Sequence, residues 1–254
     1  MFRIKICGVT NVPDAITAVD AGADAIGLNF YEKSKRWVTV SDAEKICGRV
    51  GNQVLRVGVF VNPEWFAATK TRFEVGLDAI QLHGDERPSE VARFAKEQDE
   101  ELLSSQVEVM ARFMPQPLPE EFRAIKRQFK AKVIWARRID ERGPKTICRD
   151  LEECKSLGAA PITLLLDSAA PGAFGGTGHT APWLEIAECS SSFGDTPLIL
   201  AGGLTPDNVA EAIRIVRPHG VDVASGVESA PGKKDPVKVR DFIAAARAAF
   251  GAPL

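Results

Sequence analysis

The sequence predicts an α/β fold in which one parallel sheet closes into a (β/α)8 barrel. The chain has 254 residues, close to the typical barrel size of about 250. Eight short apolar segments recur along it, each followed by a turn and a segment with helical spacing, which is the pattern of βα units. These segments are mostly continuous rather than alternating, as strands covered on both faces require. We therefore expect one barrel domain over residues 1–254.

The predicted strands are rich in Val, Ile, Leu and Ala. In order they are 2–7, 25–30, 55–61, 79–83, 133–136, 162–167, 198–201 and 221–225. An open, doubly wound sheet would give the same local alternation, and periodicity alone does not distinguish it from a barrel. The number of strands favours the barrel, since a barrel of this class closes with eight.

Helix starts follow several of these strands. A proline or serine next to an acidic residue is typical of a first helical turn, because proline has no amide hydrogen to leave unpaired and an acid suits the positive helix end. Such starts are Pro13-Asp14, Ser41-Asp42, Pro88-Ser89-Glu90 and Pro206-Asp207. They predict helices that begin near residue 13 and that cover 43–50, 91–96 and 209–216.

The segment between strands four and five is too long for one helix and two turns. Acidic residues at 99–101, followed by Pro115 and Pro117, predict an insertion around 99–118. We expect a helix over 120–129 to lead into strand five, and an extra hairpin or loop that includes 107–113. The sequence does not reveal what this insertion does.

Composition narrows the class of protein. A hydrophobic fraction of 45% and a charged fraction of 26% suit a globular domain that needs no disulfide or metal for stability. A net charge of −2 without a basic block argues against nucleic acid as a partner. The five cysteines are odd in number and form no CxxC pair, and no leader or long apolar run is present, so we expect a cytoplasmic protein.

Cys7 closes the first predicted strand and is followed by Gly8. Catalytic groups of such barrels lie at the carboxyl ends of the strands. A thiol can act as a base once its pKa falls from the ordinary value of about 8.5. The sequence does not show whether Lys5 contributes, because this side chain either points away from Cys7 or lies deeper. A strand cysteine is more often a small buried apolar residue, so Cys7 is informative only with a partner.

Asp167 is that partner. It ends an apolar strand, where burial would raise the pKa of its carboxyl group and let it donate a proton near neutral pH. An aspartate after a strand also commonly caps a turn. The joint presence of Cys7 and Asp167 favours an acid and a base at one end of the barrel.

Two glycine turns predict a phosphate site. Gly202 and Gly203 follow strand seven, and Ser225 and Gly226 follow strand eight. In barrels these two loops bind phosphate together with a helix N-terminus, because glycine lets backbone amides approach the anion. Glycines that only turn the chain would explain each loop alone but not both. Another glycine-dense stretch, 171–179, is either a loop that closes over a ligand or a plain connection.

Two further side chains are candidates for substrate binding. Arg36 follows strand two, and its guanidinium suits a carboxylate, with a solvated surface position as the alternative. His83 ends strand four and is expected to line the pocket, although a lone histidine there is more often packed. His179 and His219 lie in loops without ligand spacing, so we expect no metal.

Together these motifs resemble the phosphoribosylanthranilate isomerases of tryptophan biosynthesis. The matching runs are KICGVT at 5–10, GADAIGLNF at 22–30, VGVFVN at 57–62, IQLHGDE at 80–86, LLLDS at 164–168, GGTGHT at 175–180, ILAGGLTPDNV at 199–209 and VDVASGVE at 221–228. They occur in the family's order over almost the whole chain, and the combination is specific where no single run is. The chain departs in having Lys35 where the family commonly has proline, and in being longer than most stand-alone members.

The resemblance implies a role for each candidate. Cys7 would be the general base and Asp167 the general acid; Arg36 would hold the anthranilate carboxylate, and the two glycine turns the phosphate. The implied reaction is an Amadori rearrangement of a phosphorylated aminosugar through an iminium ion. Because the iminium is itself the electron sink, no cofactor is expected.

Two other classes stay open at this stage. A related barrel, such as an indole-glycerol-phosphate synthase, would be expected to use a lysine acid, and no strand-end lysine is comparably placed. A non-catalytic phosphosugar-binding protein would keep the glycine turns without needing both Cys7 and Asp167. We expect a monomer or a homodimer that contacts no membrane. The use of a second aminosugar substrate stays open.

Overall fold

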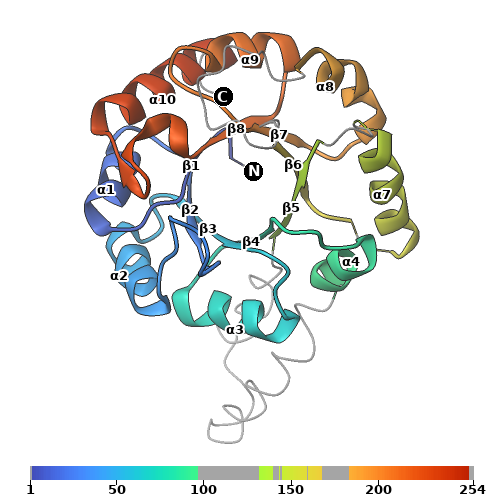
Figure 1. Cartoon of the computed structure of the whole chain (residues 1–254), viewed down its shortest axis with the longest axis horizontal. Coiled ribbons are helices and arrows are strands. Elements are labelled where there is room, and N and C mark those ends of the chain that lie inside the picture. Colours follow the sequence, from blue (N-terminus) through green and yellow to red (C-terminus); the bar gives the residue numbers. More distant parts are fainter. Residues whose placement is uncertain are drawn as a thin grey trace, which may run out of the picture.

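The computed structural model describes residues 2–96, 132–139, 143, 145–158, 160–167 and 183–251. Eight parallel strands close into a barrel in sequence order, and the last strand pairs with the first (Figure 1). The helices form an outer ring around it. This closure confirms the predicted (β/α)8 barrel and excludes the open sheet.

All eight barrel strands lie within two residues of their predicted bounds. They are β1 (Ile4–Cys7), β2 (Ala25–Asn29), β3 (Leu55–Phe60), β4 (Ala79–Leu82), β5 (Lys132–Arg138), β6 (Thr163–Asp167), β7 (Leu198–Ala201) and β8 (Gly220–Val223). A one-turn 3-10 helix, η2 (Ser225–Val227), follows β8, and then comes a hairpin of β9 (Glu228–Ala230) and β10 (Lys233–Lys234). The sequence did not predict this hairpin.

Eight α-helices are described, and the side chains of Asn11, Thr39 and Asp235 cap the first turns of three of them. They are α1 (Val12–Asp20), α2 (Val40–Val50), α3 (Trp65–Val75), α4 (Pro88–Lys96), α7 (Lys145–Ser156), α8 (Trp183–Cys189), α9 (Val209–Val216) and α10 (Pro236–Phe250). A further 3-10 turn, η1 (Ser190–Phe193), follows α8. Within the described part of the chain, no helix combines the length and apolar character that crossing a membrane requires.

Two helix starts were predicted too late: α4 begins at Pro88 rather than at 91, and α2 also begins three residues early. The pair Ser41-Asp42 was expected to precede α2, but the helix begins at Val40, with Thr39 as its N-cap. The Thr39 hydroxyl accepts a hydrogen bond from the Asp42 backbone N–H at 3.0 Å. A threonine three residues before an acid satisfies a free amide of the first turn, so the cap lies at Thr39 rather than at Ser41.

The expected insertion lies outside the described residues. Strands β4 and β5 are direct neighbours, with Ile80 paired to Val133. The chain from α4 to β5 therefore connects two adjacent strands, and residues 97–131 belong to that connection. The predicted insertion around 99–118, the loop over 107–113 and the helix over 120–129 all fall within this range.

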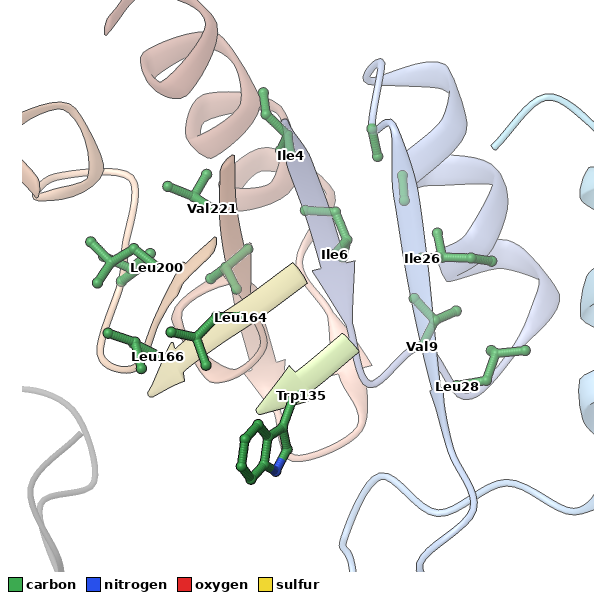
Figure 2. Close-up of a cluster of buried hydrophobic side chains, with 14 of the residues drawn as sticks. Ile4, Ile6, Val9, Ile26, Leu28, Trp135, Leu164, Leu166, Leu200 and Val221 are labelled. Atoms are coloured by element: carbon green, nitrogen blue, oxygen red, sulfur yellow. The ribbon is translucent and has the colours of Figure 1, made fainter. Parts of the chain in front are cut away.

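Alternate residues of each strand pack in two separate clusters. One row faces the helices, as Ile4 and Ile6 do on β1 and as Leu164 and Leu166 do on β6 (Figure 2). The other row faces the inside of the barrel and forms a smaller apolar cluster with residues such as Leu165. Because side chains alternate along a strand, the residues between the helix-facing ones point into the barrel.

Removing a strand side chain that faces the helices should destabilise the barrel. Ile80 on β4 is fully buried, so Ile80→Ala should lower the free energy of unfolding by about 2–5 kcal/mol through lost apolar burial and a residual cavity. Ile162 is 44% exposed just before β6 and provides the control, since Ile162→Ala should cost less than about 1 kcal/mol. Urea unfolding measures both, and equal losses would contradict the assigned faces.

Candidate functional site

Cys7 and Asp167 lie at the same end of the barrel. Cys7 is the last residue of β1 and Asp167 the last residue of β6. Both follow helix-facing neighbours, Ile6 and Leu166, so both belong to the row that points inward. The structure therefore brings the two predicted proton-transfer residues to the carboxyl ends of the strands.

A glycine on the neighbouring strand makes room for the thiol. Gly27 of β2 pairs directly with Cys7. A Cβ atom at Gly27 would lie 2.7 Å from Cys7 Sγ and 3.1 Å from Lys5 Cε, closer than real Cβ contacts. Any larger residue at this position would displace the thiol from the barrel interior.

Burial keeps the Cys7 thiol protonated in this structure. Burial raises the pKa of Cys7, and the nearby Asp222 carboxylate raises it further. Lys5 and Lys234 act in the opposite direction but do not outweigh burial, so the pKa stays above its ordinary value. The fall in pKa that a thiolate base needs is therefore not supplied by the protein alone.

Lys5 lies deeper in the barrel, directly below Cys7. Its ammonium group is fully buried and donates hydrogen bonds to Asp222 Oδ1 and to Gln81 Oε1, both at 2.9 Å. Its positive charge also acts on the neighbouring Cys7 side chain, where it favours the thiolate form. Burial works against the charge, but Asp222 and Cys7 outweigh it and raise the pKa of Lys5, so the group stays an ammonium. The sequence left open whether Lys5 acts on Cys7. The structure shows that it lies deeper on the same face, because residues two apart on a strand share a face.

His83 connects this buried group to Asp167. Its backbone N–H donates to Phe60 O, which extends the pairing of β4 and β3 by one residue. The ring lies with Nδ1 3.0 Å from Gln81 Nε2 and with Nε2 3.7 Å from Asp167 Oδ2. His83 therefore does face the barrel mouth, beside the predicted acid.

Arg36 reaches the mouth across the end of β1. A Cβ atom at Gly8 would overlap the Arg36 side chain, so glycine is required where the arginine crosses. The turn before it is held by the Ser34 hydroxyl, which accepts hydrogen bonds from Asn29 Nδ2 and from the Arg36 backbone N–H, both at 3.1 Å. These bonds order the turn although Lys35 stands where the family commonly has proline.

Glu228 orients the guanidinium of Arg36. Arg36 Nε and Nη2 donate to the two Glu228 carboxylate oxygens, each at 2.7 Å. Burial alone would raise the pKa of Glu228, but hydrogen bonds from Arg36 and the charge of Lys234 outweigh it and lower that pKa. The pair is thus ionic, and its side-on geometry fixes the plane of the guanidinium.

Lys234 joins this pair to the ends of two strands. Lys234 is only 2% exposed. Its ammonium donates to Cys7 O at 2.6 Å, Ala224 O at 3.0 Å and Glu228 Oε1 at 3.1 Å. Its backbone N–H donates to the Asp14 carboxylate at 2.8 Å. All three ammonium hydrogens are therefore used in holding the site together.

The two glycine turns pack against each other. Gly202 and Gly203 have φ angles of 88° and 65°, which side chains with a Cβ rarely adopt. A Cβ atom at Gly226 would overlap the Leu204 carbonyl oxygen, so the Ser225-Gly226 turn approaches the other loop closely. The predicted phosphate loops are thus neighbours at the mouth, beside the start of α9.

Other candidates lie away from the mouth or outside the described residues. The glycine-dense stretch 171–179, with His179, is among those not described. A hollow of about 980 Å³ lined by Arg3, Asp24 and Arg247 lies at the opposite end of the strands, where barrel residues serve stability. No group of three or more His, Cys, Asp or Glu side chains in the described ranges is arranged to hold a metal ion.

Sequence reasoning missed the residues that support the site, namely Gln81, Asp222, Glu228 and Lys234. A signal for the first two was present, because each is a polar residue between apolar ones in a buried strand. Glu228 and Lys234 gave no comparable signal, since charged residues after a strand are usually solvated.

Comparisons with known proteins agree on one family. A sequence profile described as "N-(5'phosphoribosyl)anthranilate (PRA) isomerase" matches residues 4–133 and 144–245. The N-(5'-phosphoribosyl)anthranilate isomerase of Geotalea uraniireducens is 40% identical over 247 residues, which cover 97% of this chain and 99% of that protein. That of Geobacter metallireducens is also 40% identical, over 98% of this chain and 100% of that protein.

Solved structures give the same result. A phosphoribosyl anthranilate isomerase from Thermotoga maritima has a TM-score of 0.72 and 35% identity, covering 98% of this chain and 100% of that one. A second isomerase structure, in complex with reduced 1-(o-carboxyphenylamino)-1-deoxyribulose 5-phosphate, has a TM-score of 0.68 and 34% identity over the same shares.

Loss of the Lys234 ammonium should destabilise the folded protein. Lys234→Met removes the ammonium donor from two backbone carbonyl oxygens and leaves the buried Glu228 carboxylate with Arg36 as its remaining cationic partner, so we expect the free energy of unfolding to fall by about 3 kcal/mol or more. The adjacent Lys233 is exposed, and Lys233→Met should change it by less than about 0.5 kcal/mol. Chemical denaturation of both variants tests this, and a small effect at Lys234 would contradict the structural role.

Proposed function

The chain belongs to the N-(5'-phosphoribosyl)anthranilate isomerase family, and from this premise we propose that it isomerises N-(5'-phosphoribosyl)anthranilate to 1-(2-carboxyphenylamino)-1-deoxyribulose 5-phosphate in tryptophan biosynthesis. The observation that carries the proposal is the placement of Cys7 and Asp167 as inward-facing final residues of β1 and β6. Loss of substrate fluorescence on adding protein tests it directly.

Asp167 begins the reaction as general acid. It protonates the ring oxygen of the ribose while the C1'–O bond breaks, and the anilino nitrogen supplies the electron pair that forms the C1'=N iminium ion. Asp167 is left as a carboxylate. Its neighbour His83 lies on the side from which that new charge can be stabilised.

Cys7 completes the reaction as general base. The Cys7 thiolate removes the C2' proton, and the C–H electron pair moves into a C1'=C2' bond as the iminium becomes a neutral enolamine. Tautomerisation of this enolamine gives the ketone. The substrate gains one proton from Asp167 and loses one to Cys7, so the overall change is an isomerisation with no net gain or loss of atoms. Solvent takes up the proton that the thiol loses beforehand and returns one to Asp167.

The raised pKa of Cys7 fits this order of events. In the structure, burial holds the thiol in its neutral form. Formation of the iminium places a positive charge next to the sulfur, and an adjacent positive charge lowers a thiol pKa. The thiol then gives its proton to solvent at the barrel mouth, and the thiolate is the form present when the base is needed, with Lys5 and Lys234 adding to the effect.

Arg36 and the glycine turns hold the two anionic ends of the substrate. Glu228 occupies Nε and one N–H of Nη2, which leaves N–H donors of Arg36 for the anthranilate carboxylate. The adjacent turns at Gly202-Gly203 and Ser225-Gly226 support a phosphate site, because their backbones can approach an anion closely. With its carboxylate bound by Arg36 and its phosphate by the glycine turns, the substrate would place its sugar between Cys7 and Asp167.

The alternative functions have less support. A lyase with a lysine acid would need a free ammonium at the mouth, but Lys5 is below the strand end and bonded to Asp222 and Gln81. A non-catalytic binding protein would not require the paired Cys7 and Asp167. We further propose a cytoplasmic location, supported by five free cysteine thiols, and the state of monomer or homodimer stays a prediction.

Loss of either proton-transfer group should act on the chemical step. Cys7→Ala and Asp167→Asn should each lower kcat by at least about 100-fold, while binding of a reduced product analogue changes little. The amide of Asp167→Asn preserves shape but delivers no proton. Steady-state kinetics with calorimetric binding separates the two effects, and a kcat within about tenfold of the parent in either variant would remove that residue from the mechanism.

Loss of Arg36 should act mainly on binding. A charge-assisted contact is worth about 1.5–3 kcal/mol, so Arg36→Met should raise KM by about 10-fold to 150-fold and lower kcat less. The exposed Lys33 gives the control, since Lys33→Met should leave KM unchanged. An aniline analogue without the carboxylate should not distinguish parent from Arg36→Met. Equal losses on both substrates would show that Arg36 supports the fold or the phosphate site instead.

A further inference from the structure

A continuous line of polar side chains crosses the inside of the barrel from the base to the acid. Lys5 and the Cys7 thiol both lie against Gly27, and Lys5 donates a hydrogen bond to Gln81 Oε1 at 2.9 Å. Gln81 Nε2 lies 3.0 Å from His83 Nδ1, and His83 Nε2 lies 3.7 Å from Asp167 Oδ2. Lys5 and Gln81 are fully buried, so no water competes for these groups at the centre of the line.

The direction of each bond follows from the ammonium at one end. A lysine ammonium has three hydrogens to donate and no lone pair to accept with. Lys5 donates two of them, to Asp222 Oδ1 and to the side-chain amide of Gln81. The Gln81 atom that faces Lys5 must therefore be its carbonyl oxygen, and this settles which way the amide is turned.

The orientation of Gln81 in turn decides the tautomer of His83. With its oxygen toward Lys5, the amide presents its NH2 group to His83 Nδ1. That nitrogen can only accept this bond if it carries no hydrogen. In the neutral ring the hydrogen is then on Nε2, the atom that faces Asp167.

We propose that Lys5 and Gln81 are positioning residues that hold His83 as its Nε2–H tautomer, so that the ring donates to the Asp167 carboxylate formed when the acid gives up its proton. The consequence for catalysis rests on the proposed function; the tautomer itself does not. A donor 3.7 Å from Asp167 is too far for a full hydrogen bond in this structure, and it can tighten as charge develops on the carboxylate. The opposite tautomer would place a lone pair against that charge.

The tautomer can be read directly from the nitrogen atoms of the ring. The chain has three histidines, so a long-range ¹H–¹⁵N spectrum of their side chains is simple, and His83→Asn identifies the signals of His83. At about pH 8, above the ordinary histidine pKa of about 6.5, we expect Nδ1 without a hydrogen and Nε2 with one. A protonated Nδ1 in the parent protein would overturn the proposal without any variant being made.

Gln81→Glu should reverse the arrangement. One carboxylate oxygen can still accept from Lys5, while the other can only accept from His83, so Nδ1 should become protonated. We expect kcat to fall about tenfold with KM within about twofold, because the ground-state contacts of the substrate are unchanged. An unprotonated Nδ1 in this variant would contradict the inference. Gln81→Met, which can neither donate nor accept, provides a second variant and should leave a mixture of tautomers; a ring still held wholly as Nε2–H there would also contradict it.

The failure of this inference differs from the failure of the proposed function. If Asp167→Asn kept full activity, the assigned acid would be wrong although the spectrum of His83 could be as expected. If Nδ1 of His83 carried the hydrogen in an enzyme that needs Asp167, the positioning role of Lys5 and Gln81 would be wrong while the acid stood.

Discussion

The buried ammonium of Lys5 is the constraint around which the inside of the barrel is arranged. A charge in an apolar interior costs several kcal/mol unless it is paired and fully hydrogen-bonded. Asp222 on β8 supplies the opposite charge and Gln81 on β4 the neutral acceptor. Strand β8 pairs with β1 where the barrel closes, and β4 lies on the other side of the barrel. The Lys5 ammonium therefore links β1 both to its neighbour β8 and to β4. The site is built on this polar layer.

The reactive groups at the barrel mouth are held in place by buried residues next to them. Cys7 stands directly above Lys5, in the space that Gly27 leaves open. Arg36 is held by Glu228, and Glu228 by Lys234. The groups assigned to proton transfer and binding thus depend on charged residues that are assigned no contact with substrate. Reactive groups keep a fixed geometry only when such supporting residues hold them in place.

The strands were predictable because burial on both faces leaves a plain mark in the sequence. A short unbroken apolar run such as Leu164-Leu165-Leu166 is typical of a strand covered on both sides, and its end at Asp167 placed a carboxylate at the mouth. The start of α2 was less predictable, since Thr39 and Ser41 both offer a capping hydroxyl and only the structure shows which is used. The β9–β10 hairpin escaped prediction because its strands are three and two residues long. Strands this short carry no periodicity.

The supporting residues were harder to predict than the reactive ones. Arg36 and Glu228 are 192 positions apart, and Lys234 is 227 positions from the Cys7 carbonyl that it binds. Nothing local distinguishes Lys234 from its exposed neighbour Lys233. Lys5, Gln81 and Asp222 were accessible in principle, since each interrupts an apolar strand with a polar residue on its inward face. That interruption predicts burial but does not say which partner meets which.

The bond between Lys234 and the Cys7 carbonyl also has a meaning for the order of synthesis. A ribosome makes Lys234 227 residues after Cys7, when all eight barrel strands have already been synthesised. Until then the nascent chain carries the thiol without Asp222, Glu228 or Lys234 around it. Burial and Asp222, which raise the pKa of the Cys7 thiol in the folded protein, therefore act only once the later strands have been made. The surroundings of Cys7 are thus complete only when β8 and the segment after it have joined β1. Synthesis of Cys7 alone does not assemble the site.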